Sequence, residues 1–403
     1  MAADMRRVPV GLVATALLLP STLAVMGTAI LGPVLPDLFK HFADTPHVDY
    51  LAPLVLTMPS ICIALFSTLA GFVGDKIGRR RFLLVALTAY GFVGVAPMAL
   101  DSLVVILVSR FVLGLTEAVI LTMSTTMIVD YFKGPEREKW LAYQTALAAI
   151  SAVVFSLLGG MFGGLGWRGP FIAYSSSLLM FLLVWLFTHK PDSSDISHNL
   201  KPVRDTSWRS VLTPRLIGIC AISGFASVIF FTLPIDLGMA LHAVGLRNPA
   251  AIGGVMAVST LGIAAGTLLF RVLASRPPAT ILAMAFGLAG VGFVTISHVD
   301  DFRLMAGAAF VNQVGCGIAL PTLLTWSMRD LPFEARGRSM GIFQSSFAAG
   351  QFFSAIAITA AAHAAGGVLP GFQILGAITL GAALLASIAH WAIKPKADSL
   401  TAT

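Results

Sequence analysis

A glutamate and an arginine lie within one long apolar stretch of this 403-residue chain. Glu117 falls near the middle of residues 103–131, and Arg110 stands seven positions before it. Seven residues of α-helix rise about 10.5 Å and complete almost two turns, so both side chains should lie on one helix face. An ionised carboxylate in the middle of a bilayer costs several kcal/mol, so an acid there indicates a functional site. We therefore expect Glu117 to bind and release a proton beside Arg110; the alternative is a permanently protonated glutamate that only packs two helices.

Further polar residues at the ends and centres of apolar stretches are candidates for transport chemistry. Asp37 and Asp236 each lie beside a Leu-Pro pair, where they would serve proton entry or an outer gate unless they are only solvated helix ends. Buried amides need hydrogen-bonding partners, so Asn and Gln within a span are stronger cavity candidates than Met or Phe. The residues expected to line a substrate cavity are Met26, Asn312, Gln313, Gln344, Phe347 and Gln351.

The composition shows which elements must position these residues. Hydrophobic residues make up 57% of the chain and charged residues 11%, whereas a soluble domain carries about 25% charged residues. A helix needs roughly 20 apolar residues to cross a bilayer. Twelve apolar stretches cover residues 8–35, 51–72, 82–100, 103–131, 140–165, 170–189, 216–239, 252–272, 281–298, 302–326, 340–363 and 369–393. We predict an all-α membrane protein with twelve transmembrane helices, because the stretches do not alternate as strands of a membrane barrel would.

Other reactive side chains give no sign of a metal or redox site. Cys62, Cys220 and Cys316 lie far apart inside apolar stretches and form no CxxC pair, so we expect them to pack as small hydrophobic residues. The eight histidines fall near span ends or in loops and need no catalytic role. No basic stripe with interleaved aromatic residues is present, so a nucleic-acid partner is not expected. No cofactor or metal is predicted.

Lysine and arginine gather on one side of the predicted spans. Of the 26 such residues, those on the opposite side or inside a span are Lys40, Arg168, Arg247, Arg303 and Arg110. The positive-inside rule therefore predicts that both chain termini are cytoplasmic.

A long polar connection divides the spans into two sets of six. We predict an N-terminal six-helix bundle in residues 1–189, a cytoplasmic linker in residues 190–215 and a C-terminal six-helix bundle in residues 216–403. The halves resemble each other at an offset near 200 residues, as Asp130 and Asp330 illustrate. A parallel repeat of this kind is typical of two bundles that rock about a central cavity.

The connection between the second and third predicted helices carries a distinctive motif. Residues 71–81 read GFVGDKIGRRR, which resembles the signature loop of the major facilitator superfamily. The resemblance implies a cytoplasmic lock between this loop, the end of the fourth helix and the basic start of the eleventh. The matching residues are Gly71, Asp75, Gly78, Arg79, Asp130, Arg336 and Arg338. The alternative is a solvated basic loop, which would account for Arg80 and Arg81 but not for Asp75.

The fourth and fifth predicted helices carry two further motifs. Arg110, Gly114 and Ala118 are similar to the superfamily's second motif, which implies a part in proton coupling. The fifth helix keeps the twin glycines Gly159 and Gly160 that exporters carry there, but it lacks their preceding proline. The assignment to export is weakened by this loss but not removed.

The whole pattern resembles the twelve-span drug:proton antiporters of this superfamily. It implies a monomeric secondary transporter in a bacterial inner membrane that exports a small organic compound or drug in exchange for protons. The chain contains no GxxxxGK[ST] motif, so a gradient rather than ATP must supply the energy. One alternative is a proton-coupled importer of a sugar, organic acid or nucleoside; another is a transport-inactive membrane scaffold or receptor. None of these is an enzyme.

Overall fold

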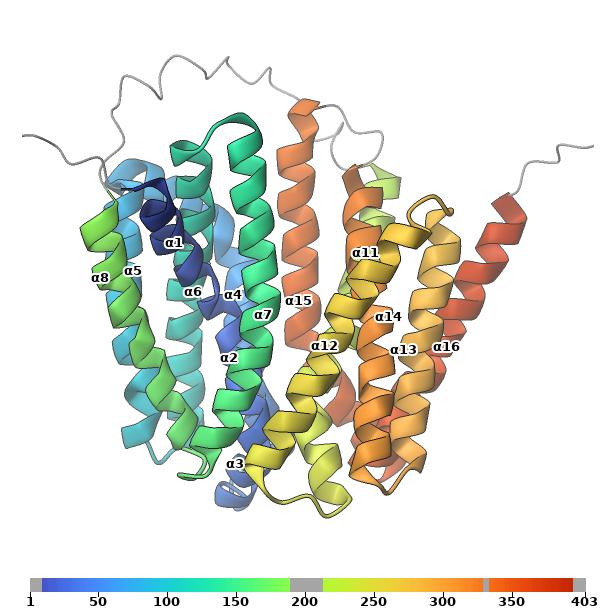
Figure 1. Ribbon diagram of the computed structural model, residues 1–403. Helices are drawn as coiled ribbons and strands as arrows, with labels where there is room; N and C mark the ends of the chain where they lie inside the picture. Colours follow the sequence, from blue (N-terminus) through green and yellow to red (C-terminus); the bar gives the residue numbers. More distant parts are fainter. Residues whose placement is uncertain (1–8, 189–212, 329–332, 394–403) are drawn as a thin grey trace, which may run out of the picture.

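The computed structural model describes residues 9–188, 213–328 and 333–393 (Figure 1). Its first half contains α1 (Val10–Ser21), α2 (Leu23–Leu31), η1 (Gly32–Val34), α3 (Leu35–His41), α4 (Val48–Ile77), α5 (Arg79–Val95), η2 (Ala96–Ala99), α6 (Leu103–Tyr131), α7 (Gly134–Gly163), η3 (Gly169–Ser175) and α8 (Ser176–Phe187). Its second half contains α11 (Pro214–Ala243), α12 (Pro249–Leu273), α13 (Pro278–His298), α14 (Phe302–Met328), α15 (Phe333–Ala365) and α16 (Val368–Ile393).

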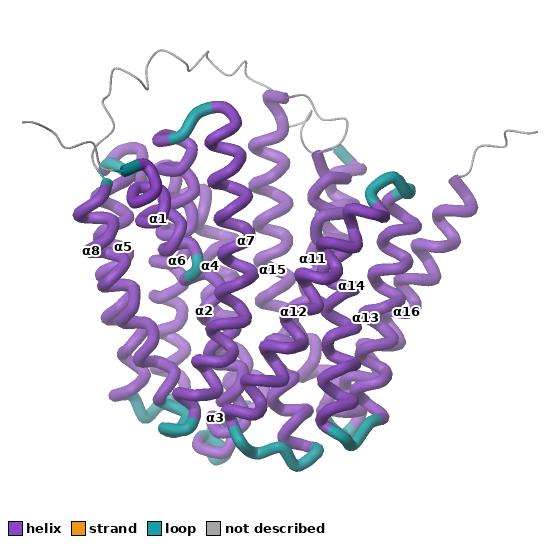
Figure 2. Tube along the Cα trace, viewed as in Figure 1, coloured by secondary structure: helices purple, strands orange, loops and turns teal. Residues whose placement is uncertain are grey.

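These elements supply twelve helical segments that are long and apolar enough to cross a membrane. The described ranges contain helices and loops but no strand (Figure 2). The prediction of an all-α protein with twelve transmembrane helices is therefore confirmed. The predicted linker, residues 190–215, lies outside the described residues except at its end, where α11 begins at Pro214.

The first span departs most from its predicted bounds. The sequence predicts one helix over residues 8–35, but α1 ends at Ser21 and the span runs from Leu23 to His41. Pro20 lies in the last turn of α1, where proline removes a backbone donor and clashes with the preceding turn. Pro33 and Pro36 lie in the first turns of η1 and α3. The chain therefore crosses as three short helical pieces instead of one rod.

Close helix contacts within the first half depend on small residues. At Gly114 of α6, an added Cβ would lie 2.6 Å from Pro59 Cα and 2.8 Å from Cys62 Cβ, both on α4. Only glycine allows the two helices to approach this closely, as at other small-residue contacts in membranes. The Sγ of Cys62 also lies 3.4 Å from the Phe111 carbonyl oxygen of α6. This weak thiol contact also joins α4 to α6.

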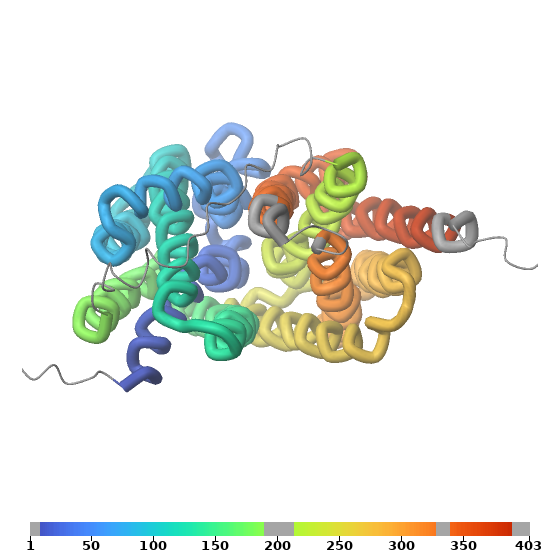
Figure 3. Tube along the Cα trace, turned by 90° about the horizontal axis from the view of Figure 1, so that it is seen from above, coloured from blue at the N-terminus to red at the C-terminus, as the bar shows by residue number. Residues whose placement is uncertain are grey.

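The two halves lie side by side when the molecule is viewed along the helices (Figure 3). They meet through α7 against α12 and through α4 against α15. We call the end where α3 finishes and α4 begins the distal end, and the end where α8 finishes and α11 begins the linker end. Helices α7 and α12 converge toward the distal end (Figure 1).

Glycines allow the two halves to touch at the distal end. A Cβ at Gly160 of α7 would lie 2.7 Å from the Pro249 carbonyl oxygen, and one at Gly253 of α12 would lie 2.5 Å from the Ser156 carbonyl oxygen. All buried residues of α7 fall between Ser151 and Gly163, in its distal half. The halves are therefore packed tightly at the distal end, while the linker half of α7 is not enclosed.

Candidate functional site

Arg110 is a fully buried cation on α6, with an exposed fraction of 0%. Its Nη2 donates to the carbonyl oxygens of Gly94 at 3.0 Å and Val93 at 3.4 Å on α5. Its guanidinium lies over the rings of Phe171 and Tyr174, at 5.0 and 4.9 Å from their centroids. Cation–π contacts of this kind contribute about 0.5–2 kcal/mol each, the larger values where water is excluded. The charge is thus held by backbone oxygens and two aromatic faces of the first half.

Glu117 lies on the same buried face of α6 and is only 2% exposed. Its Oε2 has no hydrogen-bond partner among the described residues. Arg110 and Tyr90 are electrostatic neighbours of this carboxyl group, but Arg110 is directed at α5 rather than paired directly with it. At the helical separation of about 10.5 Å and an effective dielectric near 20, two unit charges attract by about 1.6 kcal/mol. This attraction is smaller than the several kcal/mol that an ionised carboxylate costs at bilayer depth.

Two tyrosines complete the surroundings of this pair. The Tyr90 hydroxyl donates to the Leu23 carbonyl oxygen at 3.1 Å, which ties α5 to the start of α2. The rings of Tyr90 and Tyr174 lie 5.6 Å apart. Arg110, Glu117 and both tyrosines therefore form a polar cluster inside the first half, bounded by α2, α5, α6 and η3. The sequence pattern predicted the acid and the arginine but gave no signal for the tyrosines.

The signature loop holds an ion-pair network at the linker end. Arg79 Nε donates to Asp75 Oδ1 at 2.8 Å, and Arg79 Nη1 donates to Asp130 Oδ1 at 2.6 Å. Gly78 has a φ of 102°, which only glycine adopts readily, and this turn places Arg79 at the start of α5. Gly71 lies against Thr122 of α6.

The expected contribution of the second half to this lock concerns Arg336 and Arg338. Both lie at the start of α15, and their side chains fall outside the described residues. The structure thus brings together Asp75, Arg79 and Asp130, and the function of the group as a lock stays a prediction.

The residues expected to line a substrate cavity occupy different environments. Gln351 of α15 lies between the halves, with Nε2 3.5 Å from Thr28 Oγ1 on α2. Phe347 packs against the rings of Phe230 and Phe231 at 6.1 and 5.7 Å. Gln344 is exposed. Gln351, Phe347 and Gln344 therefore follow α15 along the interface side of the second half, and their cavity function stays a prediction.

The other three cavity candidates are buried in the helix packing. Asn312 Nδ2 donates to the Ala289 carbonyl oxygen at 2.7 Å, which joins α14 to α13. Gln313 Nε2 donates to the Phe230 carbonyl oxygen at 3.3 Å, and its Oε1 has no described partner. Met26 is completely buried in the core of the first half.

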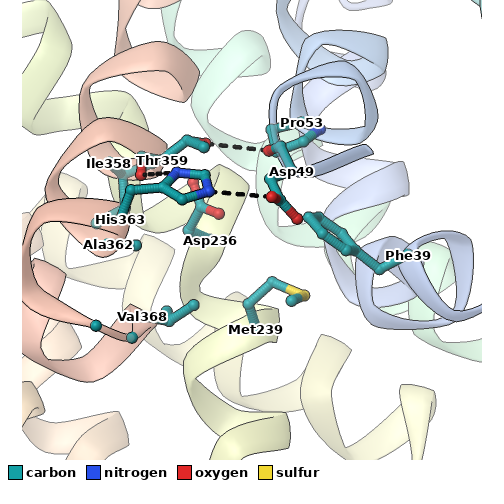
Figure 4. Close-up of a pocket in the computed structure, with 12 residues that line it drawn as sticks. Phe39, Asp49, Pro53, Asp236, Met239, Ile358, Thr359, Ala362, His363 and Val368 are labelled. Atoms are coloured by element: carbon teal, nitrogen blue, oxygen red, sulfur yellow. Dashed lines mark hydrogen bonds and ion pairs between the residues drawn. The ribbon is translucent and has the colours of Figure 1, made fainter. Parts of the chain in front are cut away.

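The structure separates the two aspartates that the Leu-Pro pairs singled out. Asp236 of α11 is 5% exposed, lines a cavity at the distal end, and has no described partner for Oδ2 (Figure 4). Asp37 of α3 is half-buried and does not line that cavity. Sequence reasoning missed two neighbours of Asp236. Asp49 and His363 come from opposite halves and approach to 3.0 Å between Oδ2 and Nε2.

Comparison with known proteins identifies the family. Residues 17–355 match the family model of the Major Facilitator Superfamily. The chain belongs to this superfamily. It is 26% identical over 373 residues to the class G tetracycline resistance protein of Vibrio anguillarum, covering 88% of this chain and 91% of that protein. It is also 26% identical over 317 residues to the class E tetracycline resistance protein of Escherichia coli, covering 76% of this chain and 71% of that protein.

A solved structure supports the same fold. The D-xylose-proton symporter matches with a TM-score of 0.75 at 14% sequence identity, covering 94% of this chain and 97% of that one. Membership of the superfamily makes this protein a multi-pass membrane transporter rather than an enzyme. The predicted resemblance to the major facilitator superfamily is confirmed.

Proposed function

We propose that this transporter exports a small organic compound, in exchange for protons, across a bacterial inner membrane. The similarity of this chain to tetracycline resistance proteins supports the proposal, because it extends over most of the length of those proteins. It assigns the linker end to the cytoplasm, as the distribution of lysine and arginine predicts. In the proposal the two halves are the moving bodies, and the partners are a small-molecule substrate, protons and the bilayer.

The observation that carries the proposal is the buried, unpartnered carboxyl oxygen of Glu117 beside the buried Arg110. With Glu117 protonated, the cluster carries the positive charge of Arg110. Loss of the proton cancels that charge, so the electrostatic field on neighbouring helices changes with each proton. Substrate and proton can therefore exclude each other without sharing a contact.

The proton gradient supplies enough free energy for this exchange. One proton provides about 1.4 kcal/mol per pH unit and about 2.3 kcal/mol per 100 mV. One pH unit together with 100 mV gives about 3.7 kcal/mol, which sustains a substrate gradient of about 500-fold.

The arrangement of the halves supports a cycle of alternating access. The distal end is closed by the contact of α7 with α12 at Gly160 and Gly253. The linker half of α7 is not buried. In the proposed orientation this is the inward-facing state, in which substrate enters from the cytoplasm. The pair of Arg79 with Asp130 would then hold the first half rigid while the second half moves.

A proton-coupled importer is the second candidate. Its support is the missing proline before Gly159 on the fifth span, since exporters among relatives often carry a glycine-proline pair there. The fold is shared with a D-xylose-proton symporter and does not discriminate between export and import.

Proteoliposomes with an imposed pH gradient test the proposal. Candidate compounds, beginning with tetracycline, are chosen by whether deletion of the transporter makes cells more sensitive to them, and their movement is followed in both directions. Acidifying the side opposite the compound should drive wild-type transport of the compound toward that side, even against the compound's concentration gradient. Glu117→Gln should lose this pH-driven transport while keeping part of its substrate exchange. Glu138→Gln, an exposed glutamate on α7, is the matched control. Import down the proton gradient would favour the second candidate, and pH-driven transport by Glu117→Gln would contradict the assigned coupling.

A further inference from the structure

A cavity of about 310 Å³ lies at the distal end between the two halves (Figure 4). Its walls come from α3 and α4 of the first half and from α11, α15, the turn that follows α15 and the start of α16 in the second. Most of its surface is apolar, from Phe39, Pro53, Met239, Ile358, Ala362 and Val368. This volume lies at the lower limit of ligand pockets, so it suits a small molecule rather than a drug-sized one. Neither Glu117 nor Arg110 borders it.

Asp236 provides the unsatisfied polar group of this cavity. Its side chain is 5% exposed, it lines the cavity, and Oδ2 has no hydrogen-bond partner among the described residues. Buried polar atoms are almost always hydrogen-bonded, and leaving one without a partner costs about 1–3 kcal/mol. A ligand that donates a hydrogen bond to this oxygen would remove that cost.

The second acidic residue of the cavity, Asp49, already has partners for its side chain and its backbone carbonyl. Asp49 Oδ2 lies 3.0 Å from His363 Nε2, and the Asp49 carbonyl oxygen accepts from Thr359 Oγ1 at 3.2 Å. His363 Nδ1 lies 3.0 Å from the Thr359 carbonyl oxygen, so both ring nitrogens face oxygen acceptors. Tyr50 stacks on the same ring at 5.3 Å.

The charges facing the cavity favour a cation. His363 Nε2 lies 3.0 Å from Asp49 Oδ2, whereas Asp236 Oδ2 has no partner among the described residues. Besides Tyr50, the other titratable groups at the distal ends of the elements around it are Asp37, Lys40 and His41 of α3 and His242 of α11, none of which lines the cavity. Among the described residues no set of three acidic, histidine or cysteine side chains is placed to hold a metal ion. An organic cation with an apolar body matches both the Asp236 carboxyl oxygen that lacks a described partner and the apolar walls.

We propose that the distal cavity binds a small aliphatic ammonium ion, with Asp236 as its counter-ion and the apolar side chains around its hydrocarbon part. Because the walls belong to both halves, such a ligand fits only while the distal end is closed. A ligand that binds only one conformation stabilises that conformation, and the stabilisation grows with the ratio of ligand concentration to Kd. In the proposed orientation the cavity faces the outside, so ammonium ions there would slow transport without being transported. The binding itself does not depend on the proposed coupling at Glu117.

The test measures thermal unfolding of the full-length protein in lipid nanodiscs, with butylammonium as the ligand and butan-1-ol as its uncharged counterpart. We expect butylammonium, at matched ionic strength, to raise the melting temperature in proportion to the logarithm of its concentration above Kd, and butan-1-ol to leave the melting temperature unchanged. Asp236→Asn should weaken butylammonium binding by about tenfold or more, because the amide oxygen can accept a hydrogen bond but no longer carries the negative charge that strengthens it. Glu117→Gln should bind as wild type does, which separates this cavity from the proposed coupling site.

Two further variants guard against misfolding and surface-charge effects. Ala362→Leu fills the cavity and leaves both carboxylates in place, so it should abolish the stabilisation even if Asp236→Asn does not fold. Asp44→Asn removes an exposed charge from the same end of the molecule and should change nothing. Equal stabilisation by butylammonium and butan-1-ol would overturn the proposal, as would equal losses in Asp44→Asn and Asp236→Asn or full stabilisation in Ala362→Leu.

Discussion

The contact between Gly253 and α7 gives a sharp test of how the two halves close. A Cβ at Gly253 would lie 2.5 Å from the Ser156 carbonyl oxygen, 2.9 Å from Gly160 Cα and 3.1 Å from Gly160 N. All three are backbone atoms, so no side chain can rotate away. Ordinary contact begins near 3.4 Å, so Gly253→Ala requires α12 to withdraw by up to about 0.9 Å. Overpacking of this kind typically costs about 1–3 kcal/mol.

That cost applies only while the distal end is closed. Gly253→Ala should therefore shift the population toward conformations with the distal end open by about 5- to 150-fold. The neighbouring glycine supplies a matched control, since a Cβ at Gly254 meets nothing within 4 Å. Both substitutions raise helix propensity by about the same amount, up to about 1 kcal/mol, so that effect cancels in the comparison.

Spin labels at two exposed distal positions report how far apart the two halves lie at the distal end. Asp44→Cys labels the first half and Arg247→Cys the second, after the three buried native cysteines are replaced. Distances between the labels should lengthen in Gly253→Ala and stay at the wild-type distribution in Gly254→Ala. Identical distributions in the two variants would refute the assignment of this glycine contact as the distal closure.

Three further predictions concern the lock, the orientation and the packing. Asp75→Asn should remain folded but reduce transport strongly, because it loses the carboxylate that pairs with the signature-loop arginine; unchanged transport rates would argue against a lock. A reporter fused at Thr403 should report a cytoplasmic location, and one inserted after Asp44 a periplasmic location; a periplasmic C-terminus would reverse the proposed orientation. Gly114→Ala should lower the free energy of unfolding by about 1–3 kcal/mol, whereas Gly218→Ala, which faces open space, should not; equal melting temperatures would contradict the close α4–α6 contact.

Much of the fold follows from the sequence because bilayer crossing imposes a simple rule. Each span needs a long apolar helix, so the twelve stretches were recognisable from hydrophobicity alone. The break at Thr22 was missed, since one proline inside an apolar stretch does not say whether a helix bends or stops. The start of α15 at Phe333 was also missed, because its first turns are polar and fall outside the hydrophobic core of the span.

The candidate site was predictable only where charge stands out against an apolar background. Glu117 and Arg110 were found in this way, and the pairing of Arg79 with Asp130 followed from a motif. The approach of Asp49 to His363 joins residues 314 positions apart, and neither is unusual at a span end. Such a contact depends on how the two halves meet, which local sequence does not encode.

Proton release on substrate binding tests the central claim, that Glu117 carries the coupled proton, most directly. Purified transporter in weak buffer is mixed with a compound shown to be transported, and the released protons are followed with a pH indicator. Wild type and Glu138→Gln should release protons as substrate binds, and Glu117→Gln, which has no carboxyl proton to lose, should release none. Release by Glu117→Gln equal to that of wild type would contradict the account and place the coupling group elsewhere, with Asp37 and Asp236 the next carboxyl groups to test.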